Sequence, residues 1–307
     1  MENDRPQKAL VICGATAIGK SEIAQIVAEK LDGEIISADS RQIYKELDIG
    51  TAKPLDTRIR HHLIDIIEPT EKFDSMKFVR LSLEAMEEIR GRGKLPIIVG
   101  GTGLYIRALT EGIFTGDFYN ENIRKNLKQR WEKGENLYDE LRRVDPEAAS
   151  KIDPNNYVRI ERALEVFLVS GKPISYWWQN ETKPPSEWKF VKILLSVERE
   201  LLYRRIEKRT RKMLESGWVD EVKNLLRRGL SPDCPGLSSI GYRQIVEFTR
   251  GEISYGEMFE SIVRETKHYA KRQIVWFKKE PNIIRIDITN LEPNIAADKI
   301  ITCFLEK

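Results

Sequence analysis

Residues 14–21, GATAIGKS, are the most informative segment of this 307-residue chain. It places two glycines, a lysine and a hydroxyl residue at the spacing of a phosphate-binding loop. An apolar run of strand type, KALVIC (8–13), comes before it, and apolar residues at helical spacing follow it. This order predicts that backbone N–H groups and a helix N-terminus bind a phosphate group, with Lys20 as a point charge and Ser21 as a Mg²⁺ ligand. The loop alone does not say which phosphate compound it binds.

Outward from this loop, strand and helix patterns alternate. We expect further strands at EIISADS (34–40), HHLIDII (61–67) and within LPIIVGGTGLY (95–105), and an amphipathic helix over 74–91. This alternation predicts an α/β fold of the P-loop type, in which helices flank a parallel sheet.

Strand patterns disappear from about residue 116 to residue 188 and return at 189–196. A long basic helical tract (198–217), further helices to about 280 and a last strand at 282–289 follow. The sequence therefore predicts a P-loop α/β core, residues 1–115 and 189–307, interrupted by an all-helical insert, residues 116–188. The end of the insert, ETKPPSEW (181–188), resembles a hinge.

Composition limits the protein class. Hydrophobic residues make up 41% of the chain, which is enough for a full core, and the net charge of +3 does not by itself indicate nucleic-acid binding. Cys13, Cys234 and Cys303 are odd in number and form no CxxC pair, which argues against disulfides and excludes a cysteine-based zinc module. Without a signal peptide or a long apolar run, we expect a cytoplasmic, non-membrane protein that acts as a monomer.

Two further strand ends carry candidate chemistry. Asp39 ends the second strand at the edge where ligands bind in parallel sheets. It could ligate a metal, act as a general base or cap a following helix. In GGTGLY (100–105) the glycines would let the backbone approach a ligand while Thr102 presents its hydroxyl; the alternative is a tight turn without chemistry.

Other candidates are less specific. His61 and His62 lack a third ligand at metal spacing, so a surface or core role is favoured. Trp177 and Trp178 could stack on bases, but a role in the core of the insert is favoured. The basic segments 204–212, 241–244 and 267–279 could be solvated helix faces, a phosphate-clamping lid of a kinase, or a surface for nucleic acid or substrate. We find no protein-kinase catalytic loop and no apolar run ending in Asp-Glu of the ATPase kind.

Several motifs together resemble one family. GATAIGKS, ADSRQIYKELDIGTAKP, HHLID, PIIVGGTGLY, RIERALEVFLVSGKPIS, IGYRQ and YAKRQIVWF occur in the order seen in the bacterial tRNA isopentenyltransferase family, over roughly residues 8–280. The resemblance implies transfer of a dimethylallyl group from its diphosphate to N6 of adenine 37 of tRNA, with release of pyrophosphate. It implies that the anticodon stem-loop of tRNA and dimethylallyl diphosphate are the partners and that Mg²⁺ is the cofactor.

The resemblance also implies residue roles. The general base would be Asp39, with Thr102 at the reacting centre. The diphosphate ligands would be Gly14, Ala15, Thr16, Ala17, Ile18, Gly19, Lys20, Ser21 and Arg243, with Mg²⁺ on Ser21. The tRNA contacts would be Asp39, Ser40, Arg41, Gln42, Thr102, Arg124, Val158, Arg159, Ile160, Glu161 and Arg162. Ala15 and Ser21 replace the Pro and Thr common in the family, and both changes preserve the loop and the hydroxyl. A prenyltransferase of free AMP or ADP and an ATP-dependent kinase remain the alternatives.

Overall fold

The computed structural model describes residues 7–54, 58–114, 116, 118–180 and 183–307. The chain divides into a core unit, Met1–Thr110 with Ser186–Lys307, and an insert unit, Glu111–Pro185. These boundaries differ by a few residues from the predicted 116 and 188. Trp188 lies in the core unit, where its indole nitrogen donates to Glu87 Oε1 at 3.0 Å. The predicted hinge includes residues 181 and 182, and the predicted absence of a signal peptide concerns residues 1–6; both lie outside the described residues.

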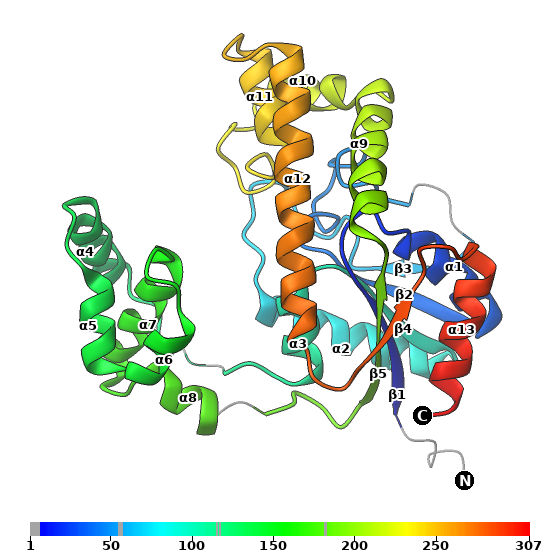
Figure 1. The fold of residues 1–307 in the computed structure, drawn as a ribbon, viewed down its shortest axis with the longest axis horizontal. Helices are drawn as coiled ribbons and strands as arrows, with labels where there is room; N and C mark the ends of the chain where they lie inside the picture. Colours follow the sequence, from blue (N-terminus) through cyan, green and yellow to red (C-terminus); the bar gives the residue numbers. More distant parts are fainter. Residues whose placement is uncertain (1–6, 55–57, 115, 117, 181–182) are drawn as a thin grey trace. The chain divides into compact units, whose positions relative to one another are not determined.

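Six parallel strands form the sheet of the core unit, in the order β3-β2-β4-β1-β5-β6 (Figure 1). The strands are β1 (Lys8–Cys13), β2 (Gly33–Ala38), β3 (His61–His62), β4 (Leu95–Gly100), β5 (Lys189–Ser196) and β6 (Ile283–Asp287). β1 lies between β4 and β5, and its residue Ile12 pairs with Val99 and Ile193. The predicted parallel α/β sheet is confirmed, and its strands read as apolar runs because both faces are covered.

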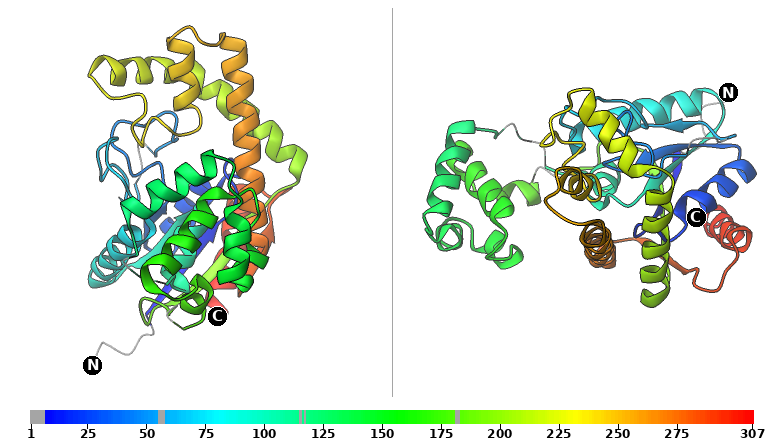
Figure 2. Two further views of the ribbon diagram at one scale, coloured as in Figure 1. Left: turned by 90° about the vertical axis from the view of Figure 1, so that its left-hand side faces the viewer. Right: turned by 90° about the horizontal axis from the view of Figure 1, so that it is seen from above.

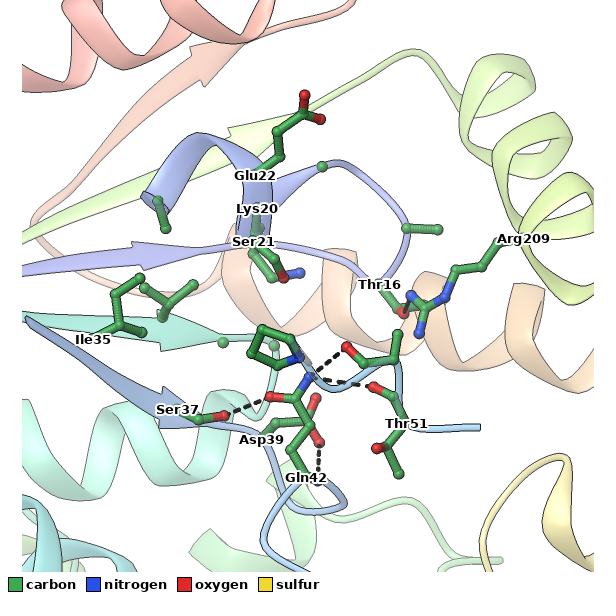
Figure 3. Close-up of a pocket in the computed structure, with 18 of the residues that line it drawn as sticks. Thr16, Lys20, Ser21, Glu22, Ile35, Ser37, Asp39, Gln42, Thr51 and Arg209 are labelled. Carbon is green, nitrogen blue, oxygen red and sulfur yellow. Dashed lines mark hydrogen bonds between the residues drawn. The ribbon is translucent and has the colours of Figure 1, made fainter. Parts of the chain in front are cut away.

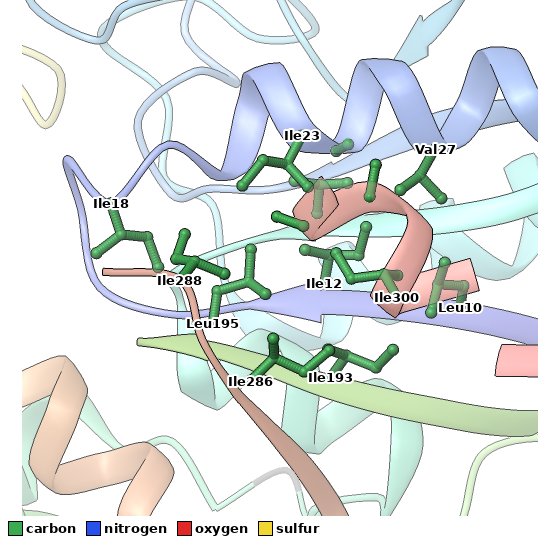
Figure 4. Packing of buried hydrophobic residues seen from close by; sticks show 14 of the residues in the cluster. Leu10, Ile12, Ile18, Ile23, Val27, Ile193, Leu195, Ile286, Ile288 and Ile300 are labelled. Carbon is green, nitrogen blue, oxygen red and sulfur yellow. The ribbon is translucent and has the colours of Figure 1, made fainter. Parts of the chain in front are cut away.

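Helices cover both faces of the sheet. α1 (Lys20–Lys30) and α13 (Pro293–Leu305) lie against one face, and α2 (Ser75–Gly91) and α3 (Gly103–Thr110) lie on the other (Figure 2). Figure 4 shows the apolar contact of the first pair, in which Val27 and Ile300 pack with Ile12 and Ile193 of the sheet. α13, which completes this layer, was not predicted from the sequence. No helix in the described part of the chain is long and apolar enough to cross a bilayer.

A group of helices stands beyond the carboxyl ends of the strands (Figure 1). These helices are α9 (Arg199–Glu215), α10 (Trp218–Arg227), α11 (Tyr242–Thr249) and α12 (Tyr255–Lys278). They enclose an apolar cluster of their own that includes Trp218, Tyr242 and Ile262 and also takes in Ile43 and Leu47 from the loop after β2. The group therefore supplies side chains at the edge where the phosphate loop lies.

The third strand is shorter than predicted. The sequence pattern indicated a strand over 61–67, but β3 comprises His61 and His62 alone. Leu63 and Asp65 have φ angles of 61° and 56°, in the left-handed region, which a strand cannot include. Asp65 instead accepts a hydrogen bond from the buried Lys53, so a side-chain contact ends the strand.

The insert unit is helical throughout its described residues. Its helices are α4 (Glu121–Glu132), α5 (Leu137–Val144), α6 (Pro146–Lys151), α7 (Tyr157–Ser170) and α8 (Ile174–Asn180). Leu127, Leu141 and Leu164 form part of its core, against which Trp177 and Trp178 pack partly buried. The core role favoured for the tryptophan pair is confirmed. The three cysteines of the chain are free, as expected.

Candidate active site

A cavity of about 380 Å³ opens at the carboxyl ends of β1, β2 and β4 (Figure 3). The phosphate loop, the turn after β2, the loop before β3, the end of β4, α9 and α12 all contribute residues to its wall. All these segments belong to the core unit. The position matches the crevice in which open parallel sheets bind ligands.

The phosphate loop has the backbone that its glycines predict. Gly14 and Gly19 have φ angles of 148° and 101°, and a side chain on Gly14 would meet the carbonyl oxygen of Leu195 at 2.6 Å. Of the eight loop residues predicted to bind diphosphate, five line the cavity: Thr16, Ala17, Gly19, Lys20 and Ser21. The side chains of Ala15 and Ile18 are buried in the core below, so these two residues contribute only backbone groups.

Lys20 begins α1 and its ammonium group lies inside the loop, donating to the carbonyl oxygen of Ala15 at 2.6 Å. Burial lowers the pKa of Lys20 from its ordinary 10.5 to about 8; Asp39 opposes this shift and Arg209 adds to it. The Lys20 ammonium group is therefore a cation that is poorly solvated by water. An anion bound beside it would stabilise the charged form.

Two arginines from α9 reach the loop. Arg205 Nη1 donates to the carbonyl oxygen of Ile18 at 2.9 Å, and Arg209 Nη1 donates to Thr16 Oγ1 at 3.0 Å. Both side chains line the cavity. The sequence analysis noted the basic segment but did not assign these residues, although a spacing of four places them on one face of a helix.

Arg243, by contrast, does not line the cavity. Its guanidinium group is half exposed and pairs with Glu265 at 2.7 Å and Glu247 at 3.7 Å. The diphosphate role that the resemblance implied for Arg243 does not fit this position. The cations that the structure brings to the loop are Arg205 and Arg209. The rest of the basic surface includes Arg199, Arg264, Lys267 and Lys271, which line a groove between α9 and α12.

Asp39 follows β2 and caps a turn. Its Oδ1 accepts hydrogen bonds from the backbone N–H groups of Arg41 at 2.8 Å and Gln42 at 3.4 Å. One predicted role of Asp39, as a cap, is thus confirmed for Oδ1, although the residues that it caps form a turn and not a helix. Oδ2 accepts no hydrogen bond from the described residues. It is the oxygen available for proton transfer or metal binding.

Thr102 lines neither the phosphate-loop cavity nor the second cavity beside it, and its side chain contacts neighbouring residues. Its Oγ1 accepts from the backbone N–H of Ser40 at 3.2 Å, and its side chain lies near Tyr269 of α12. Burial, followed by the nearby Asp39, raises the pKa of Tyr269 to about 12. Tyr269 lines the cavity and Thr102 is not among its lining residues, so the place of Thr102 at the reacting centre stays a prediction.

Gln273 of α12 connects two of the loops. Its Oε1 accepts from the N–H of Thr16 at 2.8 Å, and its Nε2 donates to the carbonyl oxygen of Gly101 at 2.9 Å. A side chain on Gly101 would meet this amide at 2.3 Å, and one on Gly103 would meet Trp276 at 2.3 Å. Gly101 and Gly103 therefore allow the close approach of α12, and Gly100 that of Ala38 in β2. Gly100 and Gly101 also line the cavity, where the sequence predicted that the backbone could approach a ligand.

Gln42 determines the shape of the opposite wall. Its Oε1 accepts from Ser37 Oγ at 2.8 Å, and its Nε2 donates to the carbonyl oxygens of Thr51 and Ala52 at 3.2 Å each (Figure 3). Both amide hydrogens are used within the protein. For the tRNA contact that the resemblance implied for Gln42, only the amide oxygen is therefore still available.

A second cavity, of about 300 Å³, adjoins the first. The two share six lining residues, Thr16, Ala17, Asp39, Thr51, Arg209 and Tyr269. The remaining wall of the second cavity comes from Ser40 and Arg41, from helices α9 to α12 and from the segment before α11. Asp39 and Arg209 thus lie where the phosphate-loop cavity and the second cavity adjoin.

Comparisons with known proteins agree with this geometry. The family model described as IPP transferase matches residues 42–280, and one described as isopentenyl transferase matches residues 7–63. The chain belongs to the IPP transferase family. A tRNA dimethylallyltransferase of Thermotoga petrophila is 46% identical over 287 residues, which cover 92% of this chain and 93% of that protein. One of Geobacter sulfurreducens is 43% identical and covers 90% of each chain.

Solved structures agree with the family membership. A tRNA isopentenylpyrophosphate transferase of Bacillus halodurans is 36% identical, with a TM-score of 0.71 over 98% of this chain and 97% of that chain. A eukaryotic dimethylallyltransferase acting on tRNA is 30% identical, with a TM-score of 0.80 over 98% of this chain and 80% of that chain. The family likeness therefore extends over the core and insert units of this chain.

Within this family member, the predicted tRNA-contacting residues of the insert differ in exposure. Val158 and Arg159 are exposed, and Glu161 accepts a hydrogen bond from Tyr157 at 2.6 Å. Ile160 is fully buried in the insert core, so the contact implied for its side chain is wrong. A helix presents only part of its surface, and consecutive residues of a motif cannot all face the same ligand.

Two arginines of that set, Arg124 and Arg162, share one acceptor. Arg124 binds Glu165 through Nε and Nη2, at 2.7 and 2.9 Å, and Arg162 Nη1 binds Glu165 Oε2 at 2.7 Å. The Glu165 side chain is fully buried. Both guanidinium groups remain about one-third exposed, so they keep surface for a ligand.

The donor set at the phosphate loop fits Mg²⁺. No group of three or more His, Cys, Asp or Glu side chains in the described ranges could cage a metal ion. Mg²⁺ commonly uses one or two protein oxygens together with substrate phosphates and water. Ser21 and Asp39 line the same cavity and supply oxygens of the required kind. His61 lies in the cavity wall and His62 binds Glu34, so neither histidine belongs to a metal cluster of described residues.

Proposed function

We propose that this chain transfers the dimethylallyl group of dimethylallyl diphosphate to N6 of adenine 37 of tRNA and releases pyrophosphate. One observation carries the proposal: Asp39 lines both the phosphate-loop cavity and the second cavity. A carboxylate in this position can meet a donor on one side and an acceptor base on the other. The names of the relatives, tRNA dimethylallyltransferases, support this choice of reaction.

The phosphate-loop cavity would bind the diphosphate of the donor. Lys20, Arg205, Arg209 and the N-terminus of α1 supply positive potential around it. Departure of the diphosphate builds negative charge on its oxygen, and cations already in place lower the energy of that transition state. Mg²⁺ bound through Ser21 would add a Lewis-acid charge at the leaving group.

Asp39 would accept the proton. The N6 nitrogen attacks C1 of the dimethylallyl group, the C1–O bond breaks, and its electron pair leaves with the diphosphate. N6 loses one proton, which passes to Asp39. Because Oδ1 is occupied by the backbone N–H groups of Arg41 and Gln42, the proton goes to Oδ2. Tyr269, which lies near Thr102, forms the neighbouring wall and keeps its own proton at neutral pH.

The insert unit would contact the tRNA. Arg124, Arg159 and Arg162 offer partly or fully exposed guanidinium groups, which bind phosphates well. RNA recognition of unpaired loop bases requires the target base to leave its stack, at a cost of a few kcal/mol. Contacts from the insert would offset this cost. We further propose that the protein acts as a monomer, because both cavities are lined by one unit of one chain. We also propose that it acts in the cytoplasm, where it would meet its tRNA substrate.

The test uses purified protein, radiolabelled dimethylallyl diphosphate and unmodified tRNA, with nucleoside mass spectrometry of the product. Asp39→Asn is the decisive variant, because an amide oxygen still caps the turn but cannot accept the proton. We expect a loss of about 10²- to 10⁴-fold in kcat, with little change in tRNA affinity. Asp74→Asn is a matched control, because Asp74 also caps through Oδ1 but lines neither cavity.

Three outcomes would reject the proposal or part of it. Turnover of Asp39→Asn close to that of the wild type would refute Asp39 as the base. Prenylation of free AMP or ADP, with no competition from an anticodon stem-loop, would point to a free-nucleotide prenyltransferase. Transfer of the γ-phosphate of labelled ATP to an acceptor would point to a kinase, for which the same loop and arginines would serve.

A further inference from the structure

Tyr119 is an exposed aromatic ring on the insert unit. Its side chain is 61% exposed, more than any other aromatic residue among those the structure describes. Phe114, Phe118 and Trp177, which lie close in sequence or space, pack against the insert core instead. An isolated exposed tyrosine needs no explanation by itself. The surroundings of this one give it a fixed position.

One face of the Tyr119 ring is covered by a cation. The guanidinium carbon of Arg124 lies 4.9 Å from the ring centroid. Arg124 is itself immobilised, because it binds both oxygens of Glu165 through two nitrogens, at 2.7 and 2.9 Å. Such bidentate pairs fix the plane of the guanidinium group as well as its position. The ring therefore rests against a rigid surface.

The backbone beside Tyr119 is held by the same carboxylate. The N–H of Asn120 donates to Glu165 Oε1 at 3.0 Å. The side chain of Asn120 caps α4 by accepting from the N–H groups of Asn122 and Ile123, at 3.1 Å each. Glu165 is fully buried, so this anchor belongs to the insert core. Tyr119 is thus positioned from its backbone and from its ring.

A rigid, exposed ring beside a cation has the features of a base-stacking surface. Unpaired RNA bases stack on tyrosine rings and on arginine planes, and each base stacked contributes about 1–3 kcal/mol. Because the ring and the guanidinium are ordered before binding, little conformational entropy is lost on association. The positive charge of Arg124 also favours a partner with phosphates. These properties favour a nucleic acid with unpaired bases over an apolar protein surface.

We infer that Tyr119 is a stacking platform for an unpaired base of the tRNA anticodon loop, and that Glu165 positions both Tyr119 and Arg124 for it. The inference rests on the proposed function, since it deepens the role of the insert. It adds a base contact to the phosphate contacts of the arginines. Tyr119 would contribute to affinity for RNA and take no part in the chemical step.

The test compares Tyr119→Ala with Tyr119→Phe by fluorescence anisotropy. One probe is a labelled anticodon stem-loop hairpin, and the other is a fully paired RNA duplex of the same length. Tyr119→Ala should weaken hairpin binding about tenfold, whereas Tyr119→Phe, which keeps the ring, should bind within about twofold of the wild type. Duplex binding should not change for either variant. The salt dependence of hairpin binding should also stay the same, because no phosphate contact is removed.

Glu165→Gln tests the positioning role. Alone it should weaken hairpin binding, and combined with Tyr119→Ala it should add less than its separate effect, because both act on one surface. Circular dichroism of each variant checks that the insert remains folded. If Glu165→Gln unfolds the insert, the comparison of Tyr119→Ala with Tyr119→Phe still tests the inference, because the Tyr119 side chain is exposed.

Four results would overturn the inference. Hairpin affinity of Tyr119→Ala equal to that of the wild type would show that nothing stacks on the ring. An equal loss on the duplex would show that the effect does not concern unpaired bases. A loss in Tyr119→Phe as large as in Tyr119→Ala would assign the contact to the hydroxyl group. Additive effects of Glu165→Gln and Tyr119→Ala would show that Glu165 does not act through Tyr119. Prenylation by the wild-type protein is measured independently, so any of these results can occur while the proposed function stands.

Discussion

Lys20 should take up a proton when a diphosphate binds at alkaline pH. In the ligand-free protein, burial lowers the pKa of Lys20 from 10.5 to about 8, and Arg209 acts in the same direction. The anionic oxygens of a bound diphosphate would lie beside the ammonium group. They would stabilise its charged form and raise its pKa again.

The size of the effect follows from the value of about 8. About nine-tenths of the Lys20 side chains are charged at pH 7 and about one-tenth at pH 9. If only the charged form binds, the affinity for the diphosphate falls about tenfold between these pH values. Binding should take up close to one proton at pH 9 and close to none at pH 7. Cys13 and Tyr269, which also lie at this end of the sheet, have pKa values of about 12 and stay protonated in this range.

Isothermal titration of dimethylallyl diphosphate, without tRNA, measures the proton uptake. Titrations in two buffers of different ionisation enthalpy give the number of protons, and a titration of the ligand alone gives the ligand's share. Arg209→Ala is an internal check. It removes a neighbouring positive charge, so the midpoint of the fall in affinity should move above pH 8. Uptake near zero at pH 9, or an unchanged midpoint in Arg209→Ala, would refute the assignment of this titration to Lys20.

Two further predictions concern stability. Burial alone would raise the pKa of Glu34, but hydrogen bonds from Arg92 and His62 lower it from 4.5 to about 2. The charged form therefore stabilises the fold above pH 4.5, and this contribution is lost as the pH falls toward 2. Glu34→Gln should cost about 3 kcal/mol at pH 7 in urea unfolding, with a smaller difference at pH 3; a difference that grows on acidification would contradict this. Gln42→Leu removes three hydrogen bonds and should lower the unfolding free energy by about 2–3 kcal/mol and raise the KM for dimethylallyl diphosphate. A KM equal to that of the wild type would show that the 51–52 wall does not depend on Gln42.

Local patterns explain what could be predicted. The phosphate loop depends on glycines and a lysine within eight residues, and the strands on apolar runs of about six, so neighbouring residues specify both. The prediction failed where a distant side chain intervened. The strand expected over 61–67 ends after His62, where Leu63 and Asp65 adopt left-handed angles and Asp65 binds Lys53. α13 was not predicted, and its role, to cover α1 and β1, exists only in the folded core.

The site shows the same division. Lys20 and Ser21 were assigned from the sequence because they belong to the phosphate loop after β1, and Asp39 because it follows β2 directly. Arg209 and Gln273 were not, since 193 and 257 residues separate them from their partner Thr16. No short pattern reports a contact over such a separation.

Local patterns were therefore enough to predict the α/β class, the phosphate loop, the helical insert and the family that the motifs indicate. They did not predict which arginines reach the phosphate loop, and the fold places Arg205 and Arg209 there in place of Arg243. The fold also shows that Tyr269 lines the cavity, that Ile160 is buried and that Asp39 lines two cavities. The physical reason is that strands and turns depend on neighbouring residues, whereas a site depends on how α9 and α12 pack across the ends of the sheet.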